Sequence, residues 1–189
     1  MKTKFILHGG NSSKKSENNE KFFHEIINSV DSNEVKILCI YFARPEDRWE
    51  DSFDEDQTIF RCLDTPKELD IKMATLESEV LVEQIKNSDV IFINGGRKGC
   101  LKDVLLGLGN FAQLTQGKIV VGISAGASIL CKYYHSSVTN GVREGVGILP
   151  AKVFTHWNNE LTLELQELDS YKEKLPIYKI PEENFIVVE

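Results

Sequence analysis

Apolar residues along the chain form short runs that are separated by longer, periodic segments. Four runs are almost continuously apolar, as is typical of parallel strands buried on both faces: 5–7, 35–43, 88–94 and 118–123. A fifth run alternates between polar and apolar residues, which indicates an edge strand at 68–73. Helical spacing predicts helices at 21–30 and 77–87 and another that begins near Gly99. This order favours right-handed βαβ units, so we expect a three-layer, doubly wound α/β fold with a mostly parallel sheet and helices on both faces.

The pattern changes in the last third of the chain. There we expect a glycine-containing loop, a short strand, an acidic helix and two final strands about a turn, at 138–147, 152–156, 159–171, 176–180 and 185–188. No internal repeat or linker is visible, and the length suffices for one well-buried core. We therefore expect residues 1–189 to form a single domain.

One segment, 44–56, is rich in charge and carries two aromatic residues, Trp49 and Phe53. Its composition is typical of a solvated loop that leads into a helix. Long irregular segments in folds of this class often cover a site, so a lid is the alternative interpretation.

The most informative stretch is the end of the fifth strand, Gly122-Ile-Ser-Ala-Gly126. Its two glycines lack the Cβ atoms that would crowd a sharp strand-to-helix turn, and such a turn exposes the hydroxyl of Ser124 at the end of the sheet. The N–H of Ala125 would lie at the start of the following helix, where backbone donors have no internal acceptor. The pattern predicts a nucleophile elbow, with an ordinary tight turn as the alternative.

A second glycine turn, Asn94-Gly-Gly96, directly follows the fourth strand. Ligands of open parallel sheets bind outside the carboxyl ends of the strands. Because both glycine turns lie at such ends, we expect them to face one crevice.

The composition limits the classes of function. The formal charge of −7, without a face rich in Lys or Arg, argues against a nucleic-acid footprint. No stretch approaches the ~20 apolar residues of a membrane span, and the first residues lack the apolar core of a signal peptide. The four cysteines are widely spaced and form neither a metal-type pair nor a disulfide framework. We therefore expect a cytoplasmic protein with no metal, no cofactor, and no nucleic-acid or membrane partner.

A serine nucleophile needs a base, and the chain offers four histidines. His8 ends the first strand, where a glycine turn is explanation enough for it, and His24 is expected on the surface of a helix. His135 is expected beyond the elbow helix, roughly 15 Å of helical rise from Ser124. His156 ends a strand ahead of a helix and is the best placed.

The third member of such a site would be a carboxylate that orients the imidazole. Glu182 and Glu183 lie in the turn between the last two strands, from which a carboxylate can reach a histidine. Consecutive residues of an extended turn point in roughly opposite directions, so at most one of them holds the imidazole. The pattern alone leaves the choice open, and a fully solvated turn is the alternative.

Four stretches together resemble the aspartyl dipeptidase (peptidase E) and cyanophycinase superfamily of serine peptidases: Gly122-Ile-Ser-Ala-Gly-Ala127, Asn94-Gly-Gly96, Phe154-Thr-His156 and Ile180-Pro-Glu-Glu-Asn184. The resemblance runs from the first strand to residue 189, and the Ser-Ala-Gly-Ala elbow is its most specific part. It implies a class I glutamine-amidotransferase-like fold. It further implies Ser124 as nucleophile, His156 as base, Glu182 as the acid, and the N–H groups of Gly96 and Ala125 as the oxyanion hole.

The resemblance implies a serine exopeptidase or dipeptidase that cleaves short peptides, including those with an acidic N-terminal residue, through an acyl-enzyme. Arg97, Lys98 or Arg143 would supply the positive charge that an aspartyl substrate needs, with a solvated surface charge as the alternative role of each. Among its departures from the family, Arg97-Lys98 stands where relatives carry Asn-Thr, and Thr155 precedes the histidine in place of proline. Both departures bear on the substrate rather than on the catalytic atoms.

The alternative function is a glutamine-amidotransferase-like protein that binds a small molecule or a partner without turnover, or that has a different specificity. Thiol chemistry of the glutaminase kind is disfavoured, because the elbow residue is Ser124 and Cys131 lies two helical turns further along. For the oligomeric state we expect a monomer or a homodimer.

Overall fold

The computed structural model describes residues 2–96 and 100–189. Its strands are β1 Lys4–His8, β2 Glu34–Ile40, β3 Glu68–Met73, β4 Val90–Ile93, β5 Ile119–Ile123, β6 Cys131–Ser136, β7 Gly141–Glu144, β8 Leu149–Thr155, β9 Ile177–Ile180 and β10 Phe185–Val188. Its helices are α1 Glu17–Asn28, the 3₁₀ turn η1 Glu46–Arg48, α2 Trp49–Arg61, α3 Ser78–Lys86, α4 Leu101–Gly107, α5 Phe111–Leu114, α6 Ala125–Leu130 and α7 Thr162–Ser170.

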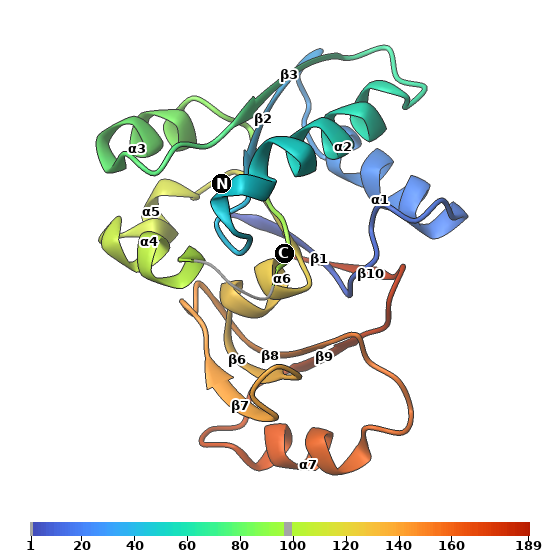
Figure 1. Cartoon of the computed structure of the whole chain (residues 1–189), viewed down its shortest axis with the longest axis vertical. Coiled ribbons are helices and arrows are strands. Elements are labelled where there is room, and N and C mark those ends of the chain that lie inside the picture. Colours follow the sequence, from blue (N-terminus) through green and yellow to red (C-terminus); the bar gives the residue numbers. More distant parts are fainter. Residues whose placement is uncertain (1, 97–99) are drawn as a thin grey trace.

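The main sheet has six strands in the order β10-β1-β5-β4-β2-β3 (Figure 1). Only β10 is antiparallel, and the other five strands are parallel, as the alternation of strands and helices predicted. β3 is the edge strand that its alternating pattern indicated. β5 lies between β1 and β4, so the carboxyl ends of these three strands meet at the middle of the sheet.

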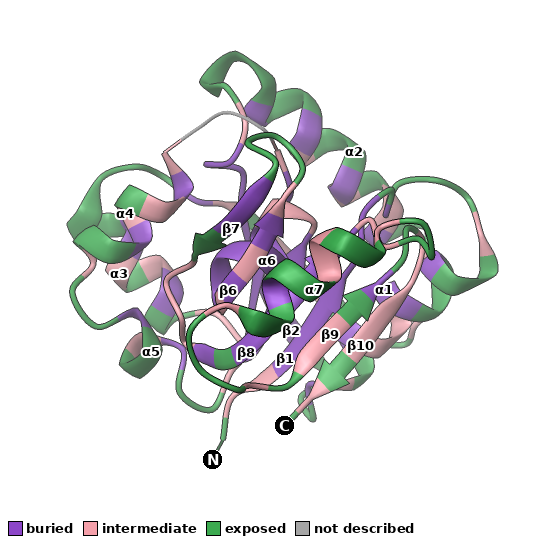
Figure 2. Cartoon of the chain, turned by 90° about the horizontal axis from the view of Figure 1, so that it is seen from below, coloured by how far each residue is buried: buried purple, intermediate pink, exposed green. Residues whose placement is uncertain are grey.

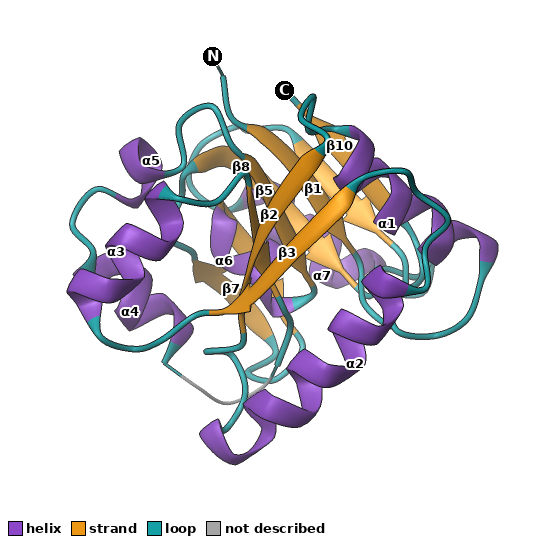
Figure 3. Cartoon of the chain, turned by 90° about the horizontal axis from the view of Figure 1, so that it is seen from above, coloured by secondary structure: helices purple, strands orange, loops and turns teal. Residues whose placement is uncertain are grey.

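Helices cover both faces of this sheet, with α1 and α2 on one side and α3, α4 and α5 on the other (Figure 3). On the first side, Phe23 of α1 and Phe60 of α2 both pack against Phe92 of β4, with ring centroids 6.3 and 5.4 Å from it. The expected mostly parallel sheet between two helical layers is confirmed. Buried residues gather in the strands and on the inward faces of the helices (Figure 2).

A second sheet of four strands, in the order β7-β6-β8-β9, extends the expected architecture. β6, β8 and β9 run parallel, and β7 pairs with β6 in the antiparallel sense. α6 packs between the two sheets and α7 covers the outer face of the second one (Figure 1). The last two strands were expected as neighbours about a turn, but β9 belongs to the second sheet and β10 to the first. The turn at 181–184 therefore carries the chain from one sheet to the other.

Two strands were missed where a helix and then a loop had been expected. The elbow helix α6 ends at Leu130, and β6 begins at the next residue. Its side chains alternate between buried and half-buried positions, and two consecutive tyrosines favour the extended conformation. β7 lies within the expected loop at 138–147 and completes the hairpin.

The segment 44–56 forms η1 and the start of α2 rather than an irregular lid. Trp49 is buried and packs against Phe42 in a tilted arrangement, with 5.2 Å between ring centroids. Its indole N–H donates to the carbonyl of Arg44. Among residues 2–96 and 100–189, no helix has the length and apolar character that crossing a membrane requires.

Candidate active site

Ser124 stands at the sharp turn between β5 and α6. Its φ of 52° and ψ of −111° place a non-glycine residue in a left-handed conformation that costs roughly 1–3 kcal/mol. The flanking glycines make this turn fit: a Cβ on Gly122 would overlap the backbone of Ala127, and a Cβ on Gly126 would overlap the carbonyl of Ile93. The strand–turn–helix geometry of a nucleophile elbow is therefore present.

Three polar side chains meet beside this turn. The Oγ atom of Ser124 lies 2.7 Å from Nε2 of His156, which follows β8. The Nδ1 atom of His156 lies 2.9 Å from Oε1 of Glu182, which follows β9. In the tautomer with the proton on Nδ1, the imidazole donates a hydrogen bond to Oε1 of Glu182, and Nε2 accepts one from the serine hydroxyl. The structure thus brings together the three side chains that the sequence had pointed to, with the polarity that a serine nucleophile requires.

The carboxyl end of β1 ties these segments to one another. Its three successive carbonyls, those of residues 8, 9 and 10, accept hydrogen bonds from the N–H groups of Ser124 at 2.9 Å, His156 at 3.0 Å and Glu183 at 2.9 Å. Each of the three segments therefore docks on the same short stretch of backbone. We call residues 8–10 the β1 clamp.

Gly10 of the β1 clamp lies directly under the imidazole of His156. Its φ of +133° is a conformation that L side chains rarely adopt, and a Cβ on Gly10 would overlap the ring. His156 itself has a φ of 54°. The imidazole packs directly on the backbone of Gly10, and only a residue without a side chain leaves room for it there.

The two neighbouring acids have different partners. Glu182 accepts from His156 on Oε1 and from Nδ2 of Asn11 on Oε2, the latter at 2.5 Å. Glu183 points away and pairs with Nζ of Lys14 at 2.5 Å, and this hydrogen bond holds the pKa of Glu183 below its usual value. Of the two alternatives left open by the sequence, it is Glu182 that contacts the imidazole.

His8 is buried and serves the scaffold. Its Nδ1 accepts from the N–H of Gly10 at 3.1 Å, and its Nε2 lies 2.9 Å from Oδ1 of Asn19. Burial lowers the pKa of His8 to about 4, so the ring is neutral at pH 7. Asn19 in turn donates to the carbonyls of Asn11 and Lys14. This network fixes the loop whose side chains hold Glu182 and Glu183.

The other two histidines lie elsewhere. His24 is half-buried on α1. His135 lies beyond the elbow helix, as expected, but on the strand β6, where it is buried and stacks on Phe154 with 4.8 Å between ring centroids. Within the described residues, neither is hydrogen bonded to Ser124.

One expected oxyanion donor directly follows the serine, and the other lies in the neighbouring strand-end turn. Ala125 is the first residue of α6, and Gly96 follows β4 in the neighbouring strand-end turn. A Cβ on Gly95 would lie 2.9 Å from Cβ of Ser124, so this turn approaches the serine closely. The N–H groups of Gly96 and Ala125 donate to no described residue, as groups kept for a ligand would.

Two arginines were expected to bind an acidic substrate. Arg97 lies outside the described residues. Arg143 is exposed on β7 and donates from Nη1 to the carbonyl of Val142.

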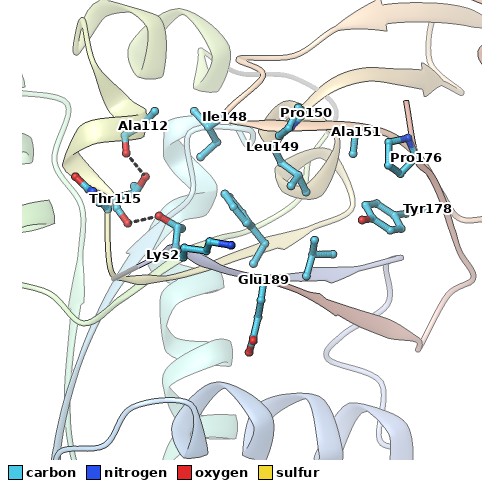
Figure 4. A pocket seen from close by; sticks show the side chains of 14 residues that line it. Lys2, Ala112, Thr115, Ile148, Leu149, Pro150, Ala151, Pro176, Tyr178 and Glu189 are labelled. Atoms are coloured by element: carbon cyan, nitrogen blue, oxygen red, sulfur yellow. Dashed lines mark hydrogen bonds between the residues drawn. The ribbon is translucent and has the colours of Figure 1, made fainter. Parts of the chain in front are cut away.

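A cavity of about 510 Å³ opens at the opposite end of the strands (Figure 4). Thr115 and Ala112 line one side of it and Pro176 and Tyr178 the other. None of the three clustered side chains reaches it. Within residues 2–96 and 100–189, no three His, Cys, Asp or Glu side chains are grouped so that they could ligate a metal.

Comparison with known proteins gives one family. The model of peptidase family S51 matches residues 5–189. The crystal structure of a peptidase from an acI-B1 actinobacterium superposes with a TM-score of 0.66 at 19% identity, over 100% of this chain and 84% of that one. A putative peptidase E protein from Listeria monocytogenes EGD-e superposes with a TM-score of 0.64 at 14% identity, over 100% and 99% of the two chains. No curated protein matches the sequence.

Proposed function

The chain belongs to peptidase family S51, and from that premise we propose that it is a serine peptidase in which Ser124, His156 and Glu182 form the catalytic triad. The observation that carries the proposal is the continuous hydrogen-bonded series from Ser124 Oγ through His156 to Glu182, at 2.7 and 2.9 Å. Membership of the family makes the protein a peptidase. The roles of these residues and the choice of substrate are our proposal.

In the first step, His156 accepts the proton of the Ser124 hydroxyl on Nε2 as the oxygen attacks the scissile carbonyl carbon. Glu182 keeps the proton on Nδ1 and stabilises the imidazolium that forms. His156 then passes the new proton to the leaving amine, which departs as the acyl-enzyme forms. Water, deprotonated by the same imidazole, hydrolyses the ester and returns Ser124 to its starting state.

The charge that develops on the carbonyl oxygen needs donors that are already in place. We assign this role to the N–H groups of Gly96 and Ala125, which flank Ser124 and donate to no described residue. Removal of one such donor typically costs about 10²–10³ in turnover.

For the substrate we propose short peptides, with an acidic N-terminal residue as the first class to test. The side chains of His156 and Glu182 are 39% and 47% exposed, so the site is open to solvent and to a small ligand. Arg143 and Arg97 are the candidates for binding an acidic side chain. The p-nitroanilides of aspartate and asparagine differ only in that side chain's charge. A higher kcat/KM for the aspartyl compound, reduced by Arg143→Met, is expected if Arg143 has this role.

The nucleophile is tested with a fluorophosphonate probe, which labels activated serines. We expect rapid labelling of the wild-type protein at Ser124, located by mass spectrometry, and none of Ser124→Ala. Ser128→Ala, one helical turn along α6, is the matched control and should label normally. Absence of labelling in the folded wild-type protein, together with no hydrolysis of either p-nitroanilide, would refute the proposed activity and favour a binding protein on the same fold.

A further inference from the structure

A buried polar network lies directly behind the strand-end turn that contains Gly95 and Gly96. At its centre is Asp56 of α2, which is only 2% exposed. Its Oδ2 accepts hydrogen bonds from the hydroxyl of Tyr41 at 2.9 Å and from Nδ2 of Asn94 at 2.6 Å. Because Asp56 is buried away from water, its carboxylate depends on these two donors for hydrogen bonds. The Asn94 side chain is therefore held with its NH₂ group toward Asp56.

With its NH₂ group turned to Asp56, Asn94 presents its carbonyl oxygen to the strand-end turn. That oxygen accepts from the N–H of Gly95 at 2.6 Å and from Nη2 of Arg44 at 3.3 Å. Asp56 therefore fixes the position of the Gly95 N–H indirectly, through the side chain of Asn94.

Arg44 contacts the next peptide group, which joins Gly95 to Gly96. Its Nε donates to the carbonyl of Gly95 at 3.0 Å. Its side-chain stem lies against the following residue, since a Cβ on Gly96 would be 3.1 Å from Cγ of Arg44. The arginine is itself anchored, because its N–H donates to the carbonyl of Tyr41 and its own carbonyl accepts from the indole of Trp49.

The direction of the Gly96 N–H follows from these contacts. The peptide bonds of the described chain are all trans, and in a trans peptide the C=O and N–H groups point in opposite directions. A carbonyl held on the Arg44 side therefore turns the Gly96 N–H away from the arginine. A glycine-glycine peptide has little conformational preference of its own, so without the arginine either direction would be open to it.

We infer that Arg44 is a positioning residue: by holding the carbonyl of Gly95, with Asn94 and Asp56 behind it, it aims the N–H of Gly96 at the oxygen of the reacting carbonyl. The inference rests on the proposed function for its catalytic consequence. Its structural part, the orientation of the Gly95–Gly96 peptide, stands independently.

Arg44→Met tests the inference, because methionine keeps much of the apolar stem and removes every donor. On aspartyl p-nitroanilide we expect kcat to fall about 10- to 100-fold while KM stays within about twofold, since the donor acts on the transition state rather than on the bound substrate. Arg44→Lys should be nearly as impaired, because an ammonium group cannot span Gly95 and Asn94 as the guanidinium does. Arg48→Met removes the same charge from an exposed site in η1 and should behave as the wild type.

Crystal structures of the two Arg44 variants give a second measurement that needs no activity. We expect the Gly95–Gly96 peptide to be rotated or in two conformations, with the distance from Ser124 Oγ to His156 Nε2 unchanged. Full activity of Arg44→Met, full rescue by lysine, or an unrotated peptide in both variants would each overturn the inference. A variant in which Ser124 and His156 have separated would also overturn it, by making Arg44 a general structural residue. If the wild-type protein neither labels nor hydrolyses, the proposed function fails, and the orientation of this peptide alone decides the inference.

Discussion

Glu182 accepts a hydrogen bond on each of its oxygens, one from His156 and the other from Asn11. A glutamine at this position has only one accepting oxygen, so its NH₂ group must face one of the two donors. The residue-scale chemistry of the site therefore depends on a pair of contacts rather than on one. The contact between Asn11 and Glu182 was not predicted from the sequence, because the two residues are 171 positions apart. The only signal for it was its place directly after a glycine turn at a strand end.

We expect Glu182→Gln to lower kcat at least about tenfold, because either the imidazole loses its acceptor or Asn11 does. Glu183→Gln should stay near the wild-type rate, since Glu183 pairs with Lys14. Steady-state kinetics of both variants on one p-nitroanilide decide between them. The reverse ranking would move the acid role to Glu183.

A reciprocal change refines this prediction. In the double variant Asn11→Asp, Glu182→Gln, the new carboxylate can accept from the glutamine NH₂, which returns the glutamine carbonyl to His156. We expect the double variant to be faster than Glu182→Gln alone. Equal rates of the two would mean that Asn11 has no part in orienting the acid.

Among substitutions that add a single methyl group near the site, Gly10→Ala should lower activity the most. The added Cβ would overlap the ring of His156 and would sit on a backbone with φ of +133°. We expect loss of nearly all turnover together with a lower melting temperature. Gly109→Ala, also at positive φ but with open space around its Cβ position, is the control and should lose stability only. Equal activity of the two variants would contradict the assigned contact.

At the scale of elements, the sequence predicted the strands and helices of the main sheet well, because buried parallel strands are continuous apolar runs. It failed at β6, whose alternating pattern at 131–136 was mistaken for the continuation of a helix. It also failed to anticipate the partners of α2, since Asp56 meets Asn94 only through the fold. The elbow was visible because its glycines are adjacent in sequence, whereas the network behind Gly95 joins three separate elements.

α2 carries a buried carboxylate at a measurable cost. Burial raises the pKa of Asp56 from 3.8 to about 6, against the opposing effect of hydrogen bonds from Tyr41 and Asn94 and of the charge on Arg44. The charge of Glu55 raises the pKa of Asp56 further. Because the folded state binds the proton more tightly than the unfolded state, the contribution of Asp56 to stability is most favourable below pH 4. It declines as the pH rises to 6 and is constant above that.

The measurement is the free energy of unfolding of Asp56→Asn and of the wild type between pH 4 and 8. Asparagine can accept both hydrogen bonds on one oxygen, as Oδ2 does now, without a charge to bury. We expect the difference in unfolding free energy to shift in favour of the variant by about 2 kcal/mol from pH 4 to pH 7. The lowered pKa of His8 acts in the opposite direction over a similar range in both proteins, so it cancels in the comparison. A difference that does not vary with pH would show that Asp56 is not buried as a charge.

At the scale of the whole molecule, the candidate site lies where the parallel strands of two mixed sheets present their carboxyl ends to each other. β1 and β5 of the first sheet supply the β1 clamp and Ser124, and β8 and β9 of the second supply His156 and Glu182. The second sheet was absent from the sequence interpretation, although its histidine and its acid were found there. Local patterns locate a strand end, but they do not say which sheet the strand joins.

The β1 clamp predicts that the amides of Ser124, His156 and Glu183 respond together to a change in β1. Ile6 is fully buried, and Ile6→Ala should destabilise this strand by about 2–5 kcal/mol. We expect hydrogen exchange of the three amides to accelerate by one common factor of at least about tenfold. Three unrelated factors would mean that the segments do not share the clamp.

The same clamp orders events while the chain is being made. Residues 8–10 leave the ribosome before Ser124, and the residues that complete the hydrogen-bonded series follow later, at positions 156 and 182. Synthesis proceeds at about 5–20 residues per second, so Ser124 spends several seconds without the imidazole and carboxylate that contact it in the folded chain. A nascent chain therefore lacks the hydrogen-bonded series from Ser124 to Glu182 until residue 182 has been synthesised. Neighbouring molecules meet Ser124 in contact with His156 only after β8 and β9 have joined the second sheet.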